Sequence, residues 1–135
     1  MSAYQQSLVE WVTQLNDTLF IQPNDALALK AIEEQVDTSL ITKINHNVYT
    51  YDQFKPGLLY VRSTSTTTQD TFSVLLTWEN PEFAENSDGV VAVRSETTTT
   101  DNGNGKETKK KNIILWDVKL VDGVRKLVGQ TEVEA

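Results

Sequence analysis

The sequence contains a single histidine, His46, and it is the first side chain to consider for acid–base chemistry. An unperturbed imidazole has a pKa of about 6.5, so it can take up and release a proton near neutral pH. The stretch SLITKINH alternates apolar and polar residues like a strand, which groups His46 with Leu40 and Ile44 on an apolar, inward face. The alternative is a turn histidine that hydrogen-bonds to its neighbours Asn45 and Asn47. The turn is the favoured interpretation, and His46 stays the candidate general base.

Established catalytic and ligand-binding motifs are otherwise missing from the sequence. The segment GNGKET resembles a phosphate-binding loop, but Glu107 follows Lys106 where Ser or Thr is required, and Thr100 stands where the leading glycine belongs. The overlapping DNGNGKE fails as a calcium loop because Gly103 occupies a ligand position. The lack of cysteine and of a second histidine excludes thiolate sites and paired-histidine sites. We therefore predict no metal site and no cofactor.

The size and charge of the chain limit the classes of function open to it. A chain of 135 residues can bury its own core, and we predict one domain over residues 1–135. The net charge of -7 disfavours nucleic acid as a partner, because phosphate neutralisation dominates that kind of binding. No apolar run approaches the ~20 residues that span a bilayer. We expect a cytoplasmic protein with neither a nucleic-acid nor a membrane partner.

The elements that would position a site follow from the periodicity of the apolar residues. Helical spacing predicts helices over about 3–20 and 24–36, and two-residue alternation predicts strands over about 39–46, 68–79, 89–100, 106–120 and 123–133. Helices followed by consecutive strands in hairpins indicate an α+β fold with a mostly antiparallel sheet.

A third helix is predicted over about 51–62 by a start signal at its N-terminal end. Thr50 can cap the amide of Gln53 while the Gln53 side chain reaches back, which is the arrangement of a capping box. Pro56 lies beyond the first turn of this helix, where its missing N–H removes a backbone hydrogen bond. We therefore expect the helix to be short or kinked.

The order of these elements resembles the nuclear transport factor 2-like superfamily, a cone-shaped fold shared by ketosteroid isomerases, scytalone dehydratase and SnoaL-like polyketide cyclases. The residues that carry the resemblance are the paired N-terminal helices, the stretch LITKINHNVYTYDQFKPGL and the closing NIILWDVKLVDGVRKLVGQTEV. They match by pattern over nearly the whole chain, without a diagnostic motif. The resemblance implies a curved, cystatin-like sheet wrapped around the N-terminal helices, with a pocket at the open end of the cone. It implies no single activity, because this fold hosts enzymes, binders and transport adaptors.

The resemblance also indicates where a catalytic acid would lie, since isomerases of this fold need a desolvated carboxylate on the inner face of the sheet. By alternation, the residues on the inner faces of the strands predicted over 68–79 and 106–120 are Phe72, Val74, Leu76, Trp78, Ile114, Trp116 and Val118. None of these residues is Asp or Glu. Asp117 and Glu79 fall on the opposite face. The sequence thus leans away from an enzyme. The candidate lining of a small apolar pocket is aromatic: Tyr49, Tyr51, Tyr60, Trp78 and Trp116.

Three functions stay open at this point. The favoured one is a protein that binds a small apolar ligand in the cone pocket without catalysis. The second is a SnoaL-like cyclase, dehydratase or isomerase acting on a hydrophobic substrate, with His46 assisted by a tyrosine. The third is a dimeric protein-interaction module like the transport factor itself.

The outer face of the sheet is expected to be covered by another molecule, because it is only half polar. Members of the superfamily often pair sheet to sheet, and a symmetric dimer is the commonest oligomer. We therefore predict a homodimer through this face. The residues assigned to it are Thr71, Ser73, Leu75, Thr77, Ile113 and Leu115.

The threonine- and lysine-rich segment 95–112 looks like a flexible tether but fits a hairpin better. Threonines suit a pleated strand, and the Asn/Gly cluster after Asp101 supplies the left-handed positions of a tight reversal. The lysines then return opposite the first strand, so Glu96 should face a lysine. The register at 100–106 is left open, because a shift of one residue exchanges the faces.

Overall fold

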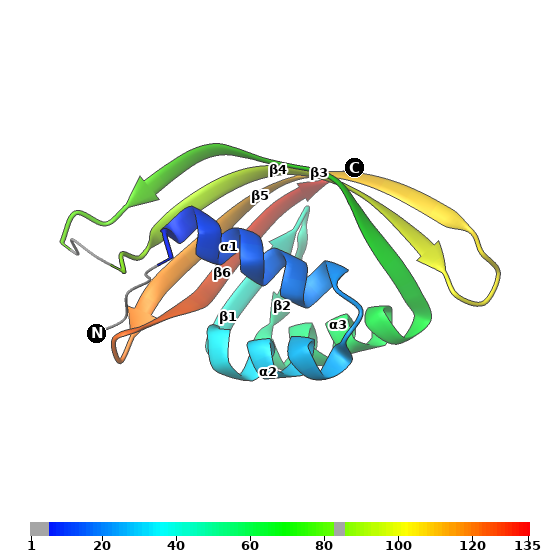
Figure 1. Ribbon diagram of the computed structural model, residues 1–135, viewed down its shortest axis with the longest axis horizontal. Coiled ribbons are helices and arrows are strands. Elements are labelled where there is room, and N and C mark those ends of the chain that lie inside the picture. Colours follow the sequence, from blue (N-terminus) through cyan, green and yellow to red (C-terminus); the bar gives the residue numbers. More distant parts are fainter. Residues whose placement is uncertain (1–5, 83–85) are drawn as a thin grey trace.

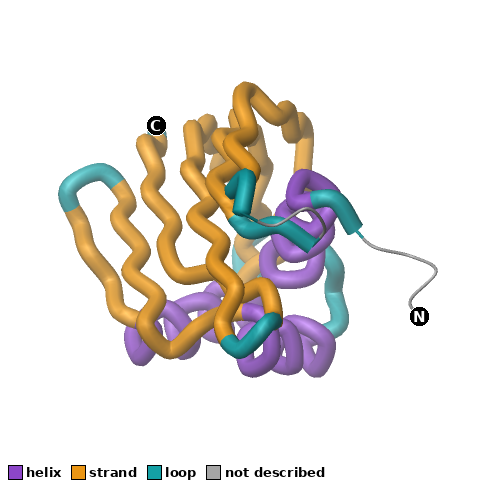
Figure 2. Tube along the Cα trace, turned by 90° about the vertical axis from the view of Figure 1, so that its left-hand side faces the viewer, coloured by secondary structure: helices purple, strands orange, loops and turns teal. Residues whose placement is uncertain are grey.

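One curved sheet and the helices on its concave side make up the part of the chain that the computed structural model describes, residues 6–82 and 86–135. Figure 1 shows the sheet arching over the helices, and Figure 2 shows the strands curling as one layer. The helical elements are α1 (Leu8–Asn16), the π-helix η1 (Asp17–Ile21), α2 (Asp25–Gln35) and α3 (Tyr51–Thr64). The strands are β1 (Val36–Ile44), β2 (Asn47–Thr50), β3 (Ser65–Glu79), β4 (Gly89–Asp101), β5 (Glu107–Val121) and β6 (Val124–Glu134).

The strand order confirms the expected α+β fold. Within the described residues the sheet runs β2-β1-β6-β5-β4-β3. Only the pair β1 and β6 is parallel, and the other neighbours are antiparallel. The strands β1 and β6 are distant in the chain, with β2, α3, β3, β4 and β5 between them, so the last strand returns beside the first. None of the described helices is long and apolar enough to span a membrane.

The first predicted helix is divided in two. Of its predicted range 3–20, residues 3–5 lie outside the described residues. The helix α1 starts at a capping box, in which Ser7 Oγ accepts from the Glu10 amide and Glu10 Oε1 accepts from the Ser7 amide. After Asn16 the backbone widens into η1, which ends where the Gln22 amide donates to the Asp17 carbonyl at 2.9 Å. Residues 20–22, at the end of η1 and directly after it, line the cavity described below.

The core lies between α1, α2 and the concave face of the sheet. Apolar side chains of both layers are fully or almost fully buried there: Leu8, Val12, Leu15, Leu19, Ile32, Val91, Val93, Trp116 and Leu127. Burying this apolar surface is the main stabilising contribution, at about 25 cal/mol per Å². The rings of Phe20 and Trp116 make an edge-type contact with 6.4 Å between centroids, which joins η1 to β5.

The helix α3 is longer than predicted and continues through Pro56 to Thr64. Its start matches the predicted signal, since the Thr50 amide donates to Gln53 Oε1 at 2.9 Å. Pro56 removes only the hydrogen bond that the Asp52 carbonyl would accept, and Asp52 is exposed. Water can therefore replace the missing donor, and the helix does not end there.

A bulge in β3 reverses the predicted faces of its second half. Val74 pairs with Val93 and Leu76 with Ala92, so Leu75 has no partner of its own. Beyond it Thr77 pairs with the fully buried Val91 and lies on the inner face. Leu76 and Trp78 are 74% and 55% exposed on the outer face. The predicted inward position of these two residues, and the outward position of Thr77, are therefore wrong.

The hairpin of β4 and β5 has a defined register. Thr100 pairs with Glu107 and Glu96 with Lys111, so Glu96 faces a lysine as expected. The turn between the strands is held by Asp101, whose Oδ1 accepts from the amides of Gly103 and Asn104. This segment is part of the sheet rather than a tether.

Candidate functional site

A cavity of about 550 Å³ opens between η1, α3 and the concave face of the sheet. Its helical wall is mostly apolar and is formed by Phe20, Ile21, Phe54, Leu58 and Val61. Its floor on the sheet is mostly polar and includes Gln69, Ser95, Lys110, Asn112, Gln130, Glu132 and Glu134. A molecule with an apolar body and one polar end would match both surfaces.

The inner face of β6 supplies the acidic part of the floor, through Glu132 and Glu134. Glu132 lies between Ile44 of β1 and Ile114 of β5 in the register of the sheet. Burial in this setting raises the pKa of the Glu132 carboxyl, because the charged form loses its hydration. The hydrogen bond from Asn112 lowers this pKa, and the nearby charge of Glu134 raises it. The charge of Lys110 lowers it.

Asn112 of β5 holds both carboxylates in place. Its Nδ2 donates to Glu132 Oε1 at 2.8 Å and to Glu134 Oε2 at 3.0 Å. Lys110 Nζ lies 3.1 Å from Glu134 Oε1. Glu134 is thus paired with a cation, whereas Glu132 is held by a neutral amide.

A second group of polar side chains lines the end of the cavity toward β3. Asn16 Nδ2 donates to Gln69 Oε1 at 2.9 Å, and Gln69 Nε2 donates to Ser95 Oγ at 2.8 Å. Gln69 Nε2 also donates to the Glu96 carbonyl at 3.0 Å. These partners satisfy one another, so their polar atoms are already engaged at this end of the cavity.

Thr42 of β1 has a free polar atom at the floor. It is 2% exposed, and among the described residues its Oγ1 has no hydrogen-bond partner. Its strand neighbour on the same face is Gln130, which is also 2% exposed and lines the cavity. An unpaired buried hydroxyl costs roughly 1–3 kcal/mol, a cost that a bound molecule would remove by supplying a partner.

Arg62 of α3 positions the helical wall. Its side chain is 7% exposed, and its Nε lies 2.8 Å from Asp25 Oδ1. Its Nη1 donates to the Leu19 carbonyl at 2.8 Å and its Nη2 to the Gln22 carbonyl at 2.7 Å. These carbonyls lie in η1 and directly after it, so Arg62 fixes the segment that carries Phe20 and Ile21.

The structure places His46 outside the cavity. It is exposed in the turn between β1 and β2 and does not line the cavity. The strand alternation that would put it beside Ile44 stops at Asn45, which turns the chain with a φ of 54°. The side chain of Asn45 is not the hydrogen-bond partner expected for His46, because its Nδ2 donates to the Glu134 carbonyl and its Oδ1 accepts from the Glu134 amide.

Of the five aromatic residues assigned to the pocket, Tyr49 lines the cavity. Tyr51 packs partly buried against the core, and Trp116 is completely buried within it. Tyr60 and Trp78 are mostly exposed, on α3 and on the outer face of β3. The aromatic wall instead includes Phe20 and Phe54, which were not among the residues assigned to the pocket.

The sequence interpretation missed the inward carboxylates of β6. The register of β5 and β6 shifts between Asp117 and Val118, where Val128 is the extra residue. Simple alternation from the buried Leu127 would send Glu132 outward, and the shift sends it inward. The available signal was Gly129, because a glycine inside a strand often marks a bulge. In the described part of the chain, no three His, Asp or Glu side chains are grouped so that they could hold a metal ion.

Comparison by sequence finds no match among protein-family models or curated proteins. Comparison by structure finds proteins that are similar over most of their length. A ketosteroid isomerase-like protein from Erwinia carotovora atroseptica has a TM-score of 0.64 and 11% identity, over 93% of this chain and 88% of that one. A nuclear transport factor 2-like protein of unknown function in nutrient uptake, from Rhodospirillum rubrum, has a TM-score of 0.62 and 14% identity, over 95% of this chain and 98% of that one. A candidate SnoaL-like polyketide cyclase from Mesorhizobium loti has a TM-score of 0.55 and 13% identity, over 94% of this chain and 98% of that one.

Proposed function

Because the chain has the cone fold of the nuclear transport factor 2-like superfamily, we propose that it binds a small, mostly apolar molecule in the cavity. The observation that carries the proposal is the pairing of an apolar helical wall with a polar floor across about 550 Å³. Pockets for small ligands in proteins are commonly about 300–1,000 Å³, largely apolar, with a few placed polar groups.

Binding is tested with Nile red, a neutral apolar dye whose fluorescence rises in an apolar site. Gly57 offers a matched pair of variants, because it lines the cavity and a Cβ placed there meets no atom within 4 Å. Gly57→Phe should occupy part of the cavity and weaken dye binding at least tenfold. Gly57→Ala should bind like the unchanged protein and be slightly more stable, since alanine favours a helix over glycine. Equal dye binding by all three proteins would contradict the proposal.

A second candidate function is proton transfer on the bound molecule, favoured by the desolvated carboxylate of Glu132. Burial raises the pKa of Glu132, and a higher pKa makes a carboxylate a stronger general base. The test is the exchange of protons next to the carbonyl of an alicyclic ketone in D2O, followed by NMR. Exchange that is no faster with this protein than with Glu132→Gln would exclude this role.

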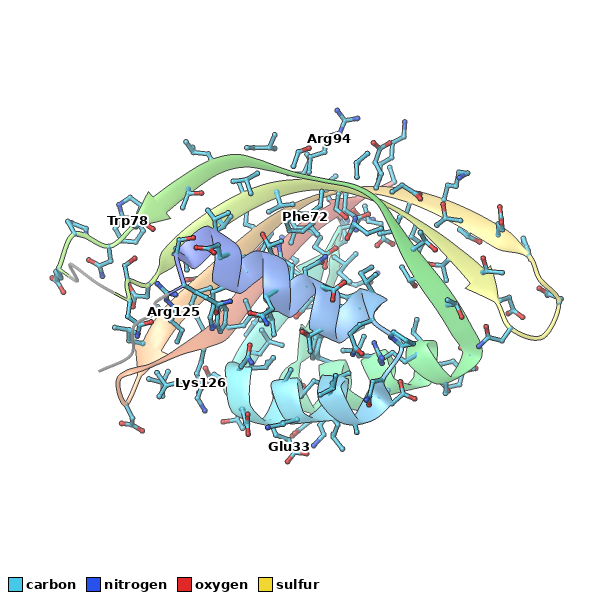
Figure 3. The ribbon with its side chains drawn as sticks, viewed as in Figure 1. Glu33, Phe72, Trp78, Arg94, Arg125 and Lys126 are labelled. Carbon is cyan, nitrogen blue, oxygen red and sulfur yellow. The ribbon has the colours of Figure 1, made fainter. Side chains whose placement is uncertain are left out.

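The outer face of the sheet supports a further part of the proposal, a homodimer. It exposes apolar side chains of three strands: Leu75, Leu76, Trp78, Ile113, Leu115 and Val133. Arg94 of β4 lies among them and points away from the helices in Figure 3, and its strand neighbours are Ser73 and Ile113. Asp117 and Glu96 also belong to this face, so it carries both signs of charge and can pair with a second copy of itself.

A further inference from the structure

We infer that the molecule bound in the cavity is cationic, an apolar amine whose ammonium group pairs with Glu132. This inference rests on the proposed binding function and adds the chemical class of the ligand. It is carried by the charges that line the cavity, by the free oxygen atoms on its floor and by its apolar wall.

The charged side chains of the cavity leave one negative charge without a partner. Five such residues line it: Asp25, Arg62, Lys110, Glu132 and Glu134. Arg62 is paired with Asp25 at 2.8 Å, and Lys110 with Glu134 at 3.1 Å. Glu132 forms no ion pair with any residue in 6–82 or 86–135. Three carboxylates thus face two cations, and both cations are already engaged.

The position of Glu132 makes this unpaired charge unfavourable in the absence of a ligand. Isoleucines flank it on both neighbouring strands, Ile44 and Ile114, and burial disfavours its charged form. A buried carboxylate is stable when a cation and further hydrogen bonds satisfy it. Asn112 already occupies Oε1, and the described residues donate no hydrogen bond to Oε2. An ammonium group would supply both the missing charge and the missing donor.

Thr42 gives an independent indication of a ligand with several donors. Its Oγ1 is buried on the cavity floor without a partner in the described residues. Thr42 pairs in register with Gln130, the inner-face residue next to Glu132 along β6. A primary ammonium has three N–H donors, so one group at this point can serve Glu132 and the hydroxyl of Thr42 together.

The rest of the cavity suits an apolar body and opposes an anion. Phe20, Phe54 and Tyr49 line it with aromatic surface, which is favourable beside a cation. A ligand carboxylate would meet Glu132 and Glu134 while both cations stay bound to their own partners. Net repulsion follows for an anionic ligand.

The test compares three probes with one skeleton, 1-adamantylamine, 1-adamantanol and 1-adamantanecarboxylate, by titration calorimetry at pH 8. We expect the amine to bind at least tenfold more tightly than the alcohol, and the carboxylate to bind more weakly than both. Glu132→Gln should lower amine affinity at least tenfold and leave alcohol affinity within twofold. Thr42→Val should weaken amine binding several-fold. Circular dichroism confirms that each variant is folded.

The matched control is Glu33→Gln, which removes the same charge from the outer side of α2, where Glu33 points away from the sheet in Figure 3. It should leave the affinities of all three probes unchanged. If the alcohol and Nile red bind but the amine has no advantage, or if Glu132→Gln keeps that advantage, the cationic ligand is refuted while the binding function stands. If no probe and no dye binds, the binding function itself fails.

Discussion

Glu132 and Glu134 share one amide group, since Asn112 Nδ2 lies 2.8 Å from Glu132 Oε1 and 3.0 Å from Glu134 Oε2. The two carboxylates are nevertheless not equivalent. Lys110 pairs with Glu134 at 3.1 Å, whereas Glu132 sits between two isoleucines, and among the described residues its one hydrogen-bond donor is the Asn112 amide. This asymmetry marks Glu132 as the chemically distinctive group of the cavity.

Replacing Glu132 by glutamine should stabilise the unliganded protein at neutral pH. Burial raises the pKa of Glu132 in the folded state, so the stability linked to its protonated form is lost as the pH rises through that pKa. At pH 7.5 the unchanged protein therefore carries the cost of the partly buried charge, and the variant does not. Urea unfolding should give the variant a higher midpoint at pH 7.5. The difference should shrink as the pH falls through the raised pKa and level off below about pH 4, where glutamate is protonated in the unfolded chain as well.

The control for this comparison is again Glu33→Gln, because Glu33 is exposed on α2. It should shift the midpoint little at either pH. A Glu132→Gln protein that is less stable than the unchanged protein at pH 7.5 would show that the carboxylate is better satisfied in the free protein than its contacts indicate.

Replacing Arg62 by methionine should loosen the helical wall of the cavity. The buried guanidinium donates to the carbonyls of Leu19 and Gln22, and hydrogen bonds to charged groups contribute about 1.5–3 kcal/mol each. We expect unfolding free energy to fall by about 3 kcal/mol and amide exchange to rise in residues 17–25, measured by mass spectrometry. Nile red binding should weaken as well, because η1 carries Phe20 and Ile21.

Asp25→Asn is the matched control for Arg62, since it removes the ion pair and leaves both carbonyl contacts. Asp25 is 65% exposed, and exposed ion pairs contribute at most about 1 kcal/mol. A loss of equal size in the two variants would mean that the ion pair, rather than the carbonyl contacts, fixes this segment.

The sequence was sufficient for the features that depend on local pattern. The capping residue Thr50, the turn after Asp101 and the facing of Glu96 by a lysine all follow from signals within a few residues, and the structure agrees with them. The faces of β3 and β6 could not be predicted in the same way. Leu75 and Val128 each insert one residue into a ladder, and each insertion reverses the alternation beyond it.

The candidate site was hidden by the second of these insertions. Counting from Leu127 without a bulge puts Glu132 outside, whereas the partner strand shows that it faces Ile114 on the inner side. The cavity wall depends on η1, a π-helical turn that periodicity does not distinguish from the end of an α-helix. The inward position of Glu132 and the π-helical turn both depend on contacts between elements that are distant in sequence. A single sequence carries no information about such contacts.

Replacing Leu115 by lysine should abolish the proposed homodimer. Leu115 is 43% exposed on the outer face and pairs in register with Ala92. A lysine there would place a charge among the apolar side chains of the face, and its desolvation on dimerisation would be unfavourable. Size-exclusion chromatography with light scattering should show a dimer for the unchanged protein at high micromolar concentration and a monomer for the variant. Tyr60→Lys, on α3 away from this face, should stay dimeric, and a monomeric unchanged protein would refute the dimer.

Binding of 1-adamantylamine should strengthen as the pH rises through the pKa of Glu132. Only the ionised carboxylate pairs with an ammonium, and burial raises the pKa of that carboxyl in the free protein, so part of it must lose a proton on binding at mildly acid pH. As the pH is lowered from 8 toward 4.5, the ordinary pKa of a glutamate, calorimetry should therefore give a falling affinity, and a heat that changes with the ionisation enthalpy of the buffer. The other ionisable side chains that line the cavity are Asp25, Tyr49, Arg62, Lys110 and Glu134. Glu132→Gln should remove both the pH dependence and the buffer dependence, and their persistence in that variant would assign the proton to one of these other groups.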